Sequence, residues 1–353
     1  ARPMQESLFD DPNAPSAPAR RPRAAKSARR DAGSDDVRAA PLDPAQRALA
    51  GALPARLRMG TSSWNFPGWA GLVWDGVYDP STLSRHGLPA YARHPLLRTA
   101  GIDRSFYRPL SASQFADHAA QVPGDFRFVV KAPSLVADAV VRDTAGRGTK
   151  VNDTFLNPAL AIEQFVQPAL EGLGDKVGAL VFQLSPLPVS MLHQLPEVLA
   201  RLRRMLLALP SLRPAAPDGV VAVEVRNPEF LTPALADVLR EAGATYCLGL
   251  HPRLPPIDEQ LPLLRALWPG PLVCRWNMNR LHGARGYEEA KSLYQPFNRI
   301  VDADLDLRAT LARVIVGTTG AGHNAYITVN NKAEGSAPLS VLALAEEVAR
   351  QRG

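Results

Sequence analysis

Cysteine is scarce in this sequence, with two residues in 353. Two cysteines cannot build the disulfide framework of a small secreted protein. Cys247 and Cys274 each lie inside an apolar run, so we expect both to be buried, reduced thiols. This usage is typical of a reducing compartment, and we expect a cytoplasmic protein.

Several other signals are also missing. No apolar run is long enough to cross a bilayer, and the amino-terminal residues lack the apolar core of a secretory signal peptide, so we expect no membrane association. No closely spaced pairs of zinc ligands occur. The segment GRGTK at 146–150 lacks the spacing of a phosphate-binding P-loop and reads as a mobile loop. We therefore expect no metal and no cofactor.

Charge of one sign does not dominate the chain. Lys and Arg exceed Asp and Glu by six, and the excess is spread along the sequence. A mild positive balance permits an anionic partner without requiring one.

Residues 1–55 are rich in Ala, Pro, Arg and Asp and show little apolar periodicity. Such a segment buries too little surface to offset its chain entropy, so we expect a disordered tail. Its basic run at 20–30 is either a solvated segment or a transient contact with nucleic acid. QESLFD resembles the peptide that bacterial repair proteins dock into the sliding clamp, with Gln5, Leu8 and Phe9 as anchors, although three fixed positions also arise by chance.

From residue 56 to 353 short apolar runs alternate with amphipathic segments. This alternation predicts an α/β fold with a parallel sheet covered by helices, and eight units fit a (β/α)8 TIM barrel better than a doubly wound sheet, which usually carries a glycine-rich first turn. The predicted strands are 57–64, 100–107, 126–131, 177–184, 220–226, 244–251, 271–276 and 325–331. The predicted helices include 158–174, 191–209, 232–243 and 337–352.

Each apolar run ends in polar residues. In a barrel, the carboxyl ends of all eight strands meet at one mouth, where active sites of this fold lie. Alternation along each strand sends every second side chain into the barrel, so Glu224 and Arg226 face inward while Val223 and Val225 face the helices. By position, the candidate mouth residues are Ser62, Trp64, Asp103, Tyr107, Lys131, Gln183, Glu224, Arg226, His251, Arg275, Asn277, Asn330, Asn331 and Glu334.

Six stretches resemble a known family, the YecE-like proteins of the domain of unknown function 72. They are GTSSWNFPGWAGLVW, IDRSFYRPL, FRFVVKAP, LVFQLSP, VAVEVRNPEF and VNNKAEGSAPLSV, and they occur in order between residues 57 and 345. The resemblance implies a TIM barrel. Likeness of the family's barrel to endonuclease-IV-like folds has prompted a nucleic-acid role, which rests on fold analogy alone.

The sequence departs from the family pattern at three places. Gly101 and Asp103 stand where the family usually has Glu and Asn, and no Thr-His pair follows the third strand. Asn277 stands where the seventh strand often carries a His, with His282 on the following loop. Roles assigned to the family's histidines therefore do not transfer to this chain.

The inward-facing charges allow two interpretations. In one, Glu224 is a general base while Arg226 and Arg275 grip an anion. In the other, the three form a stabilising salt-bridge network. Lys131 is either a Schiff-base nucleophile or one cation of that network, and Asp103 is its partner or a second catalytic carboxylate.

The remaining candidates point to ligand binding. Asn330 and Asn331 offer adjacent amides that orient a polar ligand or cap a loop, and Trp64 stacks on a ring or packs in the core.

Three functions remain open. The first is a metal-independent enzyme, of hydrolase or lyase type, acting on an anionic or polar small molecule at the barrel mouth. The second is a nucleic-acid-associated protein that holds a nucleotide in the mouth, with the tail docking the sliding clamp. The third is a ligand-binding barrel without turnover.

Overall fold

The computed structural model describes residues 36–143 and 147–352, so Gln5, Leu8 and Phe9 lie outside the described residues. Within these ranges eight parallel strands close a barrel in the order β1-β10-β9-β8-β7-β6-β3-β2. Each strand falls within one of the predicted apolar runs or within a residue of it, which confirms the (β/α)8 barrel. The barrel strands are β1 (Leu57–Thr61), β2 (Thr99–Ile102), β3 (Arg127–Lys131), β6 (Val177–Gln183), β7 (Val220–Glu224), β8 (Thr245–Leu250), β9 (Leu272–Trp276) and β10 (Ala325–Val329).

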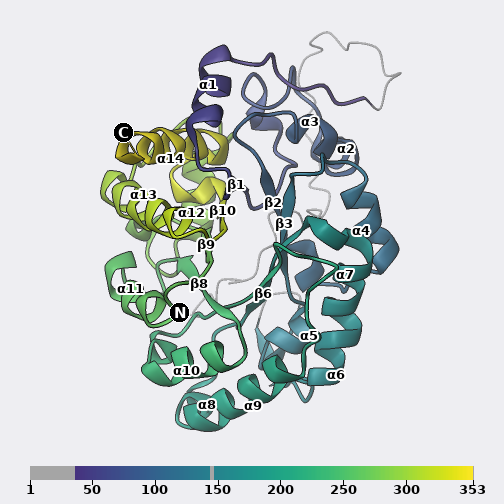
Figure 1. Cartoon of the computed structure of the whole chain (residues 1–353), viewed down its shortest axis with the longest axis vertical. Helices are drawn as coiled ribbons and strands as arrows, with labels where there is room; N and C mark the ends of the chain where they lie inside the picture. The colour runs from purple at the N-terminus through teal and green to yellow at the C-terminus, as the bar shows by residue number, and fades with distance from the viewer. Residues whose placement is uncertain (1–35, 144–146, 353) are drawn as a thin grey trace, which may run out of the picture.

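Helices surround the barrel on its outer side, with α13 and α14 across the molecule from α4 and α7 (Figure 1). Several begin at side-chain caps that the sequence supplies, such as the Ser111–Gln114 capping box of α4. The helices are α1 (Pro44–Ala52), α2 (Pro80–His86), α3 (Leu88–Tyr91), α4 (Ala112–Ala119), α5 (Ser134–Ala137), α6 (Pro158–Ala161), α7 (Gln167–Leu173), α8 (Val189–Leu192), α9 (Leu195–Ala208), α10 (Pro233–Glu241), α11 (Ile257–Ala266), α12 (Tyr287–Tyr294), α13 (Leu305–Gly320) and α14 (Ala337–Arg352).

Two apolar cores follow from the alternation along the strands. The larger core lies between strands and helices and contains Val223 and Val225. The smaller core fills the barrel and contains Val129, Val181 and Ala222, as the alternation predicts. It separates the polar residues at the two ends of the barrel.

The cysteines divide between these cores. Cys247 belongs to the inner cluster and Cys274 to the outer one, and both are buried free thiols, as predicted. None of the helices in the described ranges is long and apolar enough to cross a bilayer.

The segment before the first strand is more ordered than expected. Residues 44–52 form α1, capped by Asp43, whose side chain accepts a hydrogen bond from the Ala45 amide at 2.8 Å. Arg352, at the end of α14, donates to the Ala52 carbonyl. The expectation of a disordered tail reaching residue 55 is therefore wrong for residues 44–52, because a cap and a docking helix stabilise this segment.

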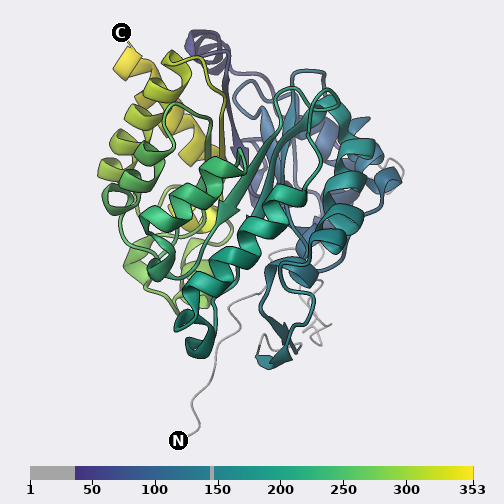
Figure 2. The same ribbon diagram turned by 60° about the horizontal axis from the view of Figure 1, so that its bottom comes forward.

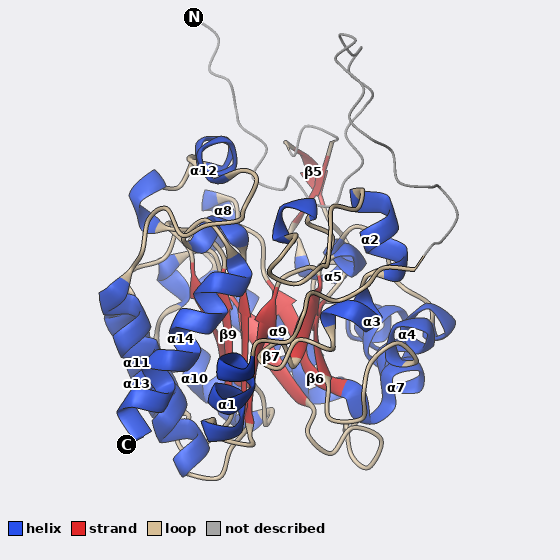
Figure 3. Ribbon diagram, turned by 90° about the horizontal axis from the view of Figure 1, so that it is seen from above, coloured by secondary structure: helices blue, strands red, loops and turns tan. Residues whose placement is uncertain are grey.

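A hairpin stands where a mobile loop was expected after the third strand. β4 (Val140–Arg142) pairs antiparallel with β5 (Gly148–Val151), and Figures 2 and 3 show this hairpin projecting beyond the end of the barrel. Arg142 forms an ion pair with Asp138 at 2.6 Å, and this pair fixes the base of the hairpin.

Candidate functional site at the barrel mouth

Strand register brings the predicted mouth residues to one level. Gln183, the last residue of β6, is opposite Glu224, the last residue of β7. On the next two strands around the barrel, Arg275 of β9 is opposite Gly249 of β8. A side chain at Gly249 would place its Cβ 3.2 Å from Glu224 Oε1, so the glycine leaves room for the carboxylate.

Glu224 is the centre of an ion-pair network. It is fully buried, and its two oxygens accept separately: Oε1 from Arg226, and Oε2 from Arg275 Nη1 at 2.6 Å. The Asn277 amide also donates to Oε1, at 3.2 Å. Gln183 Oε1 accepts from both guanidinium groups, at 3.1 Å and 3.0 Å. Every member faces inward from a strand end, as the alternation predicts.

The network fixes the charge of Glu224. Burial raises the pKa of a carboxyl group, but the charges and hydrogen bonds of Arg226 and Arg275 outweigh that effect, and the pKa falls from 4.5 to about 2. A carboxylate with such a low pKa is a weak base at neutral pH. The geometry therefore favours Glu224 as the anchor of two guanidinium groups over Glu224 as a general base.

Asp103 joins the network from the opposite side. Its Oδ2 lies 2.6 Å from Arg275 Nη2, and its side chain is 21% exposed, whereas that of Glu224 is inaccessible. Arg275 thus bridges a buried carboxylate and an accessible one. Asp103 is the carboxylate of this network that a ligand in the mouth can reach.

Lys131 differs from the other charged residues of the mouth. Its amine lies 3.7 Å from the ring centroid of Phe106, and no ion pair or hydrogen bond from this amine is present among the described residues. Ser105 holds that ring in position, because its hydroxyl donates to the Lys131 carbonyl at 2.6 Å.

The surroundings of Lys131 favour its neutral form. Burial lowers the pKa of the amine most; Arg275 and Arg226 lower it further, while Asp103 and Glu224 raise it, and the result is about 8. An ordinary lysine has a pKa near 10.5. Lys131 therefore supplies far more neutral, nucleophilic amine at neutral pH than a surface lysine does.

His251 is at the edge of the network. Its Nδ1 accepts from the Arg253 amide at 3.1 Å. Burial lowers the pKa of the imidazole well below its usual range, and the charge of Arg226 adds to the effect. His251 is therefore a neutral imidazole close to the guanidinium groups.

Arg253 is a mouth residue that sequence reasoning missed. Its Nε is buried without a hydrogen-bond partner. Burial lowers the pKa of Arg253, and the neighbouring charges that lower it further are those of Arg226, Arg285 and Arg142. The signal in the sequence was a cation two residues after the strand-end histidine, in HPR at 251–253.

Three further predicted residues follow the ends of β1, β2 and β10. Asn330 donates to the Ser62 hydroxyl at 3.0 Å and so connects the ends of β10 and β1. Tyr107 is 47% exposed.

Trp64 packs inside the protein. It is 4% exposed, the Arg104 guanidinium lies 5.7 Å from its ring centroid, and the His118 ring lies edge-on against it at 5.7 Å. This position does not offer its ring to a base or sugar.

Two residues of the NNKAE segment were placed incorrectly by the sequence. Asn331 Oδ1 accepts from Trp69 Nε1 at 3.1 Å and from the Ala337 amide at 2.8 Å, which ties a loop to the start of α14. Glu334 is fully buried and pairs with Arg308 at 2.8 Å. A short 3-10 turn over Asn331–Ala333 follows β10, so the extended backbone ends there and these side chains fix helices instead.

Metal binding has no obvious set of ligands here. Among residues 36–143 and 147–352, no group of three or more His, Cys, Asp or Glu side chains lies close enough together to hold an ion. The expectation of metal-independent chemistry stays a prediction.

Comparison with known proteins identifies the chain's relatives. A family model described as "Protein of unknown function DUF72" matches residues 58–353. A solved DUF72 family protein from Thermotoga maritima MSB8 is 18% identical with a TM-score of 0.53, covering 82% of this chain and 98% of that one. Another from Enterococcus faecalis V583 is 17% identical with a TM-score of 0.51, covering 83% and 95%. Among curated proteins none matches. At this identity the solved structures show the fold alone.

Proposed function

This chain belongs to the DUF72 family, and we propose that its barrel mouth is the active site of an enzyme that binds an anionic carbonyl compound through a Schiff base on Lys131. The observation that carries the proposal is the Lys131 amine, which is buried beside an ion-pair network and forms no ion pair with any residue that the structure describes. A lysine with only a structural role is expected to neutralise a carboxylate.

The charges of the mouth favour an anionic ligand. Arg226, Arg275 and Lys131 face two carboxylates, those of Glu224 and Asp103. While Lys131 is protonated, as most of its amine is at pH 7, one positive charge is left over at a mostly buried site, where electrostatic attraction is stronger than in water. A carboxylate or phosphate group on the ligand compensates this charge.

The chemistry follows from the neutral amine. Lys131 Nζ attacks the carbonyl carbon of the ligand, a C–N bond forms, and the carbonyl oxygen takes a proton to give a carbinolamine. One of the two amine protons is given up when the carbinolamine forms. Its hydroxyl group then takes a further proton from an acid and leaves as water, which gives an iminium ion that keeps the other proton on nitrogen. Asp103 is the accessible carboxylate close enough to act on the charge of Lys131, and it is our candidate for carrying these protons.

Glu224 has a supporting role in this proposal. Its carboxylate holds Arg226 and Arg275 on opposite oxygens, so both guanidinium groups keep a fixed direction before the ligand arrives. Such preorganisation reduces the cost of ordering charged groups when a ligand binds. Glu224 is then a positioning residue, and Lys131 is the catalytic one.

The test is chemical trapping of the imine. Pyridoxal 5′-phosphate carries an aldehyde and a phosphate, and borohydride reduces its imine to a stable adduct that peptide mass spectrometry locates. We expect the adduct on Lys131, faster with pyridoxal 5′-phosphate than with pyridoxal, which lacks the phosphate. Lys131→Met removes the adduct, whereas Lys150→Met, at an exposed hairpin position, leaves it unchanged.

The same trapping identifies substrates. Carboxylated and phosphorylated carbonyl compounds replace the probe one at a time, and a mass increase at Lys131 after reduction marks those that form the imine. Adducts spread evenly over the surface lysines, with none favoured at Lys131, would exclude a Schiff-base site and leave a ligand-binding barrel as the better account.

A further inference from the structure

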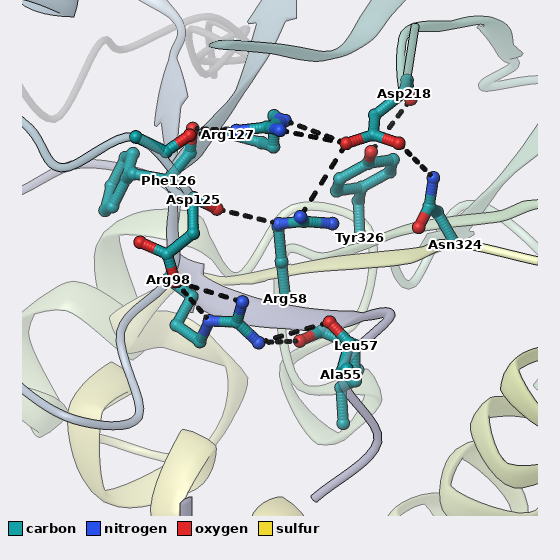
Figure 4. Close-up of polar contacts among 11 residues, drawn as sticks. Ala55, Leu57, Arg58, Arg98, Asp125, Phe126, Arg127, Asp218, Asn324 and Tyr326 are labelled. Carbon is teal, nitrogen blue, oxygen red and sulfur yellow. Dashed lines mark hydrogen bonds and ion pairs between the residues drawn. The ribbon is translucent and has the colours of Figure 1, made fainter. Parts of the chain in front are cut away.

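A second polar cluster lies at the opposite end of the barrel, about which the proposed function says nothing. Arg58 of β1, Arg127 of β3 and Tyr326 of β10 come from the amino-terminal halves of their strands, and Asp218 precedes β7 (Figure 4). We call this cluster of Arg58, Arg127, Asp218 and Tyr326 the floor of the barrel. Asp218 and Glu224 are six residues apart on an extended segment, so roughly 20 Å separates the floor from the mouth. The inner apolar core lies between them.

The floor contains more positive than negative charge. Arg127 donates to Asp218 Oδ2 at 2.9 Å, and Arg58 Nη2 lies 3.8 Å from the same oxygen. Both arginines are more than nine-tenths buried, at 7% and 8% exposed. One carboxylate therefore serves two buried guanidinium groups, and a buried charge without a full counter-charge is costly.

One hydrogen-bond donor of this floor has no acceptor. Arg58 Nε donates to the Asp125 carbonyl at 2.9 Å, but Arg58 Nη1 is buried without a partner. Figure 4 draws the unbonded end of this guanidinium on the side of Tyr326 and Asn324. Burial lowers the pKa of Arg58, and the charges of Arg127 and Arg98 lower it further, so the positive potential is concentrated here.

A cleft of about 480 Å³ opens just outside this floor. Asp218 and Asn324 line it together with three groups that carry or can carry positive charge, namely Arg56, Arg213 and His323. The two lining arginines are exposed at the surface. The buried and the exposed guanidinium groups thus lie on either side of Asp218.

Asp218 does not repel an anion as strongly as a lone carboxylate would. Its Oδ2 is occupied by the two buried arginines, and its Oδ1 accepts from the Asn324 amide at 3.3 Å. The buried Arg58 and Arg127 act on this carboxylate, and the exposed Arg56 and Arg213 line the same cleft. The cleft therefore has a positive potential although a carboxylate lines it.

We propose that this cleft is a second binding site, for a small phosphate-type oxyanion, at the amino-terminal end of the barrel. Arg56 and Arg213 contact the anion, while the buried Arg58 and Arg127 contribute charge from beneath. The ligand is either free phosphate or the phosphate group of a metabolite, since both present the same oxygens to the arginines.

The experiment uses histidine resonances as reporters for the two ends of the barrel. His323 lines the cleft and His251 borders the mouth. Side-chain NMR spectra of the histidine-labelled protein are recorded during titration with inorganic phosphate, with chloride at equal ionic strength as the reference and His323→Gln for assignment. A second titration with a phosphate monoester in place of inorganic phosphate separates the two sources.

We expect a saturable shift of His323 with phosphate and none with chloride. Arg56→Ala and Arg213→Ala, both at exposed positions, each weaken the apparent affinity by about fivefold, the scale of one exposed ion pair. Arg38→Ala, at an exposed arginine that pairs with Asp75 and does not line the cleft, leaves the affinity unchanged. Tighter binding of the monoester identifies a metabolite as the ligand.

Three results would overturn the cleft site. They are a shift confined to His251, a His323 shift that chloride reproduces, and a His323 shift unaffected by both arginine substitutions. None of these results depends on imine formation at Lys131, so failure of the cleft site and failure of the proposed function are distinguishable.

Discussion

Replacing Lys131 by methionine is expected to make the protein more stable. The side chain is buried and pays for its charge without an ion-pair partner among the described residues. Methionine keeps the length and apolar stem, and its thioether also packs well against the Phe106 ring. If Lys131 were retained for folding alone, its substitution would be expected to make the protein less stable.

The magnitude follows from the pKa of Lys131. In the unfolded chain the amine has a pKa near 10.5, and in the folded protein the pKa is about 8. At pH 7 this difference costs the folded state about 3 kcal/mol. The cation–π contact with Phe106 is lost on substitution and reduces the gain by about 1 kcal/mol. We therefore expect a net gain of about 2 kcal/mol, or about 3 °C in Tm for a chain of this size.

The gain has a defined dependence on pH. Between pH 8 and 10.5 the unfolded state binds more protons at this lysine than the folded state does, so the stability of the native sequence rises with pH through that window. The advantage of Lys131→Met is therefore full below pH 8 and fades as pH approaches 10.5. Other titrating groups are common to both proteins and cancel in the comparison.

The assay is chemical denaturation of both proteins at several pH values between 7 and about 10. Lys150→Met, at an exposed position, is the matched control and is expected to change stability by less than about 0.5 kcal/mol at any pH. A destabilised Lys131→Met protein, or a stability difference that does not vary with pH, would refute the idea that burying the charged Lys131 amine destabilises the folded protein.

Two further predictions concern the partners of Lys131. Glu224→Gln leaves two buried guanidinium groups without their shared carboxylate and is expected to destabilise the protein by about 3 kcal/mol at neutral pH in denaturant melts. Because the folded pKa of Glu224 is lowered from 4.5 to about 2, this loss of stability is present above pH 4.5 and shrinks as pH falls toward 2. A loss of stability that does not depend on pH would contradict the ion-pair account. Asp103→Asn removes a charge that raises the pKa of Lys131, so the pH midpoint of pyridoxal labelling at Lys131 is expected to move below 8, whereas a midpoint that moves upward would contradict the assigned neighbourhood.

The barrel was predictable because its strands carry a simple pattern. Runs of apolar residues mark each strand, and alternation assigns inward and outward faces without any knowledge of distant contacts. The same rule brought Glu224, Arg226, Arg275 and Gln183 together, since every strand end in a closed barrel meets at one level. The likeness in sequence to the YecE-like family pointed to the same fold.

The rest depends on contacts that the pattern does not encode. Glu334 follows the last strand by only a few residues, yet it pairs with Arg308 of α13 because the loop turns outward. Trp64 packs against Arg104 and His118 instead of facing the mouth. Arg253 was missed because its orphaned Nε is visible only when the loops are in place.

Knowing which residues are charged was also not enough to assign their roles. Sequence reasoning placed Glu224 and Lys131 together as catalytic candidates, but only their surroundings separate them. Two guanidinium groups hold the pKa of Glu224 at about 2, and burial lowers that of Lys131 to about 8. Two residues at the ends of strands of one barrel can thus have pKa values shifted by different causes.

Closure of the barrel has a consequence for how the chain is made. Leu57 of β1 pairs with Ala325 of β10. One edge of β1 therefore has no partner strand until nearly the whole chain has been synthesised. At ribosomal rates of about 5 to 20 residues per second, that interval is roughly 15 to 50 seconds. Throughout this time one edge of β1 presents unpaired amide and carbonyl groups. The newly synthesised chain therefore passes through a long aggregation-prone stage that the finished barrel no longer displays.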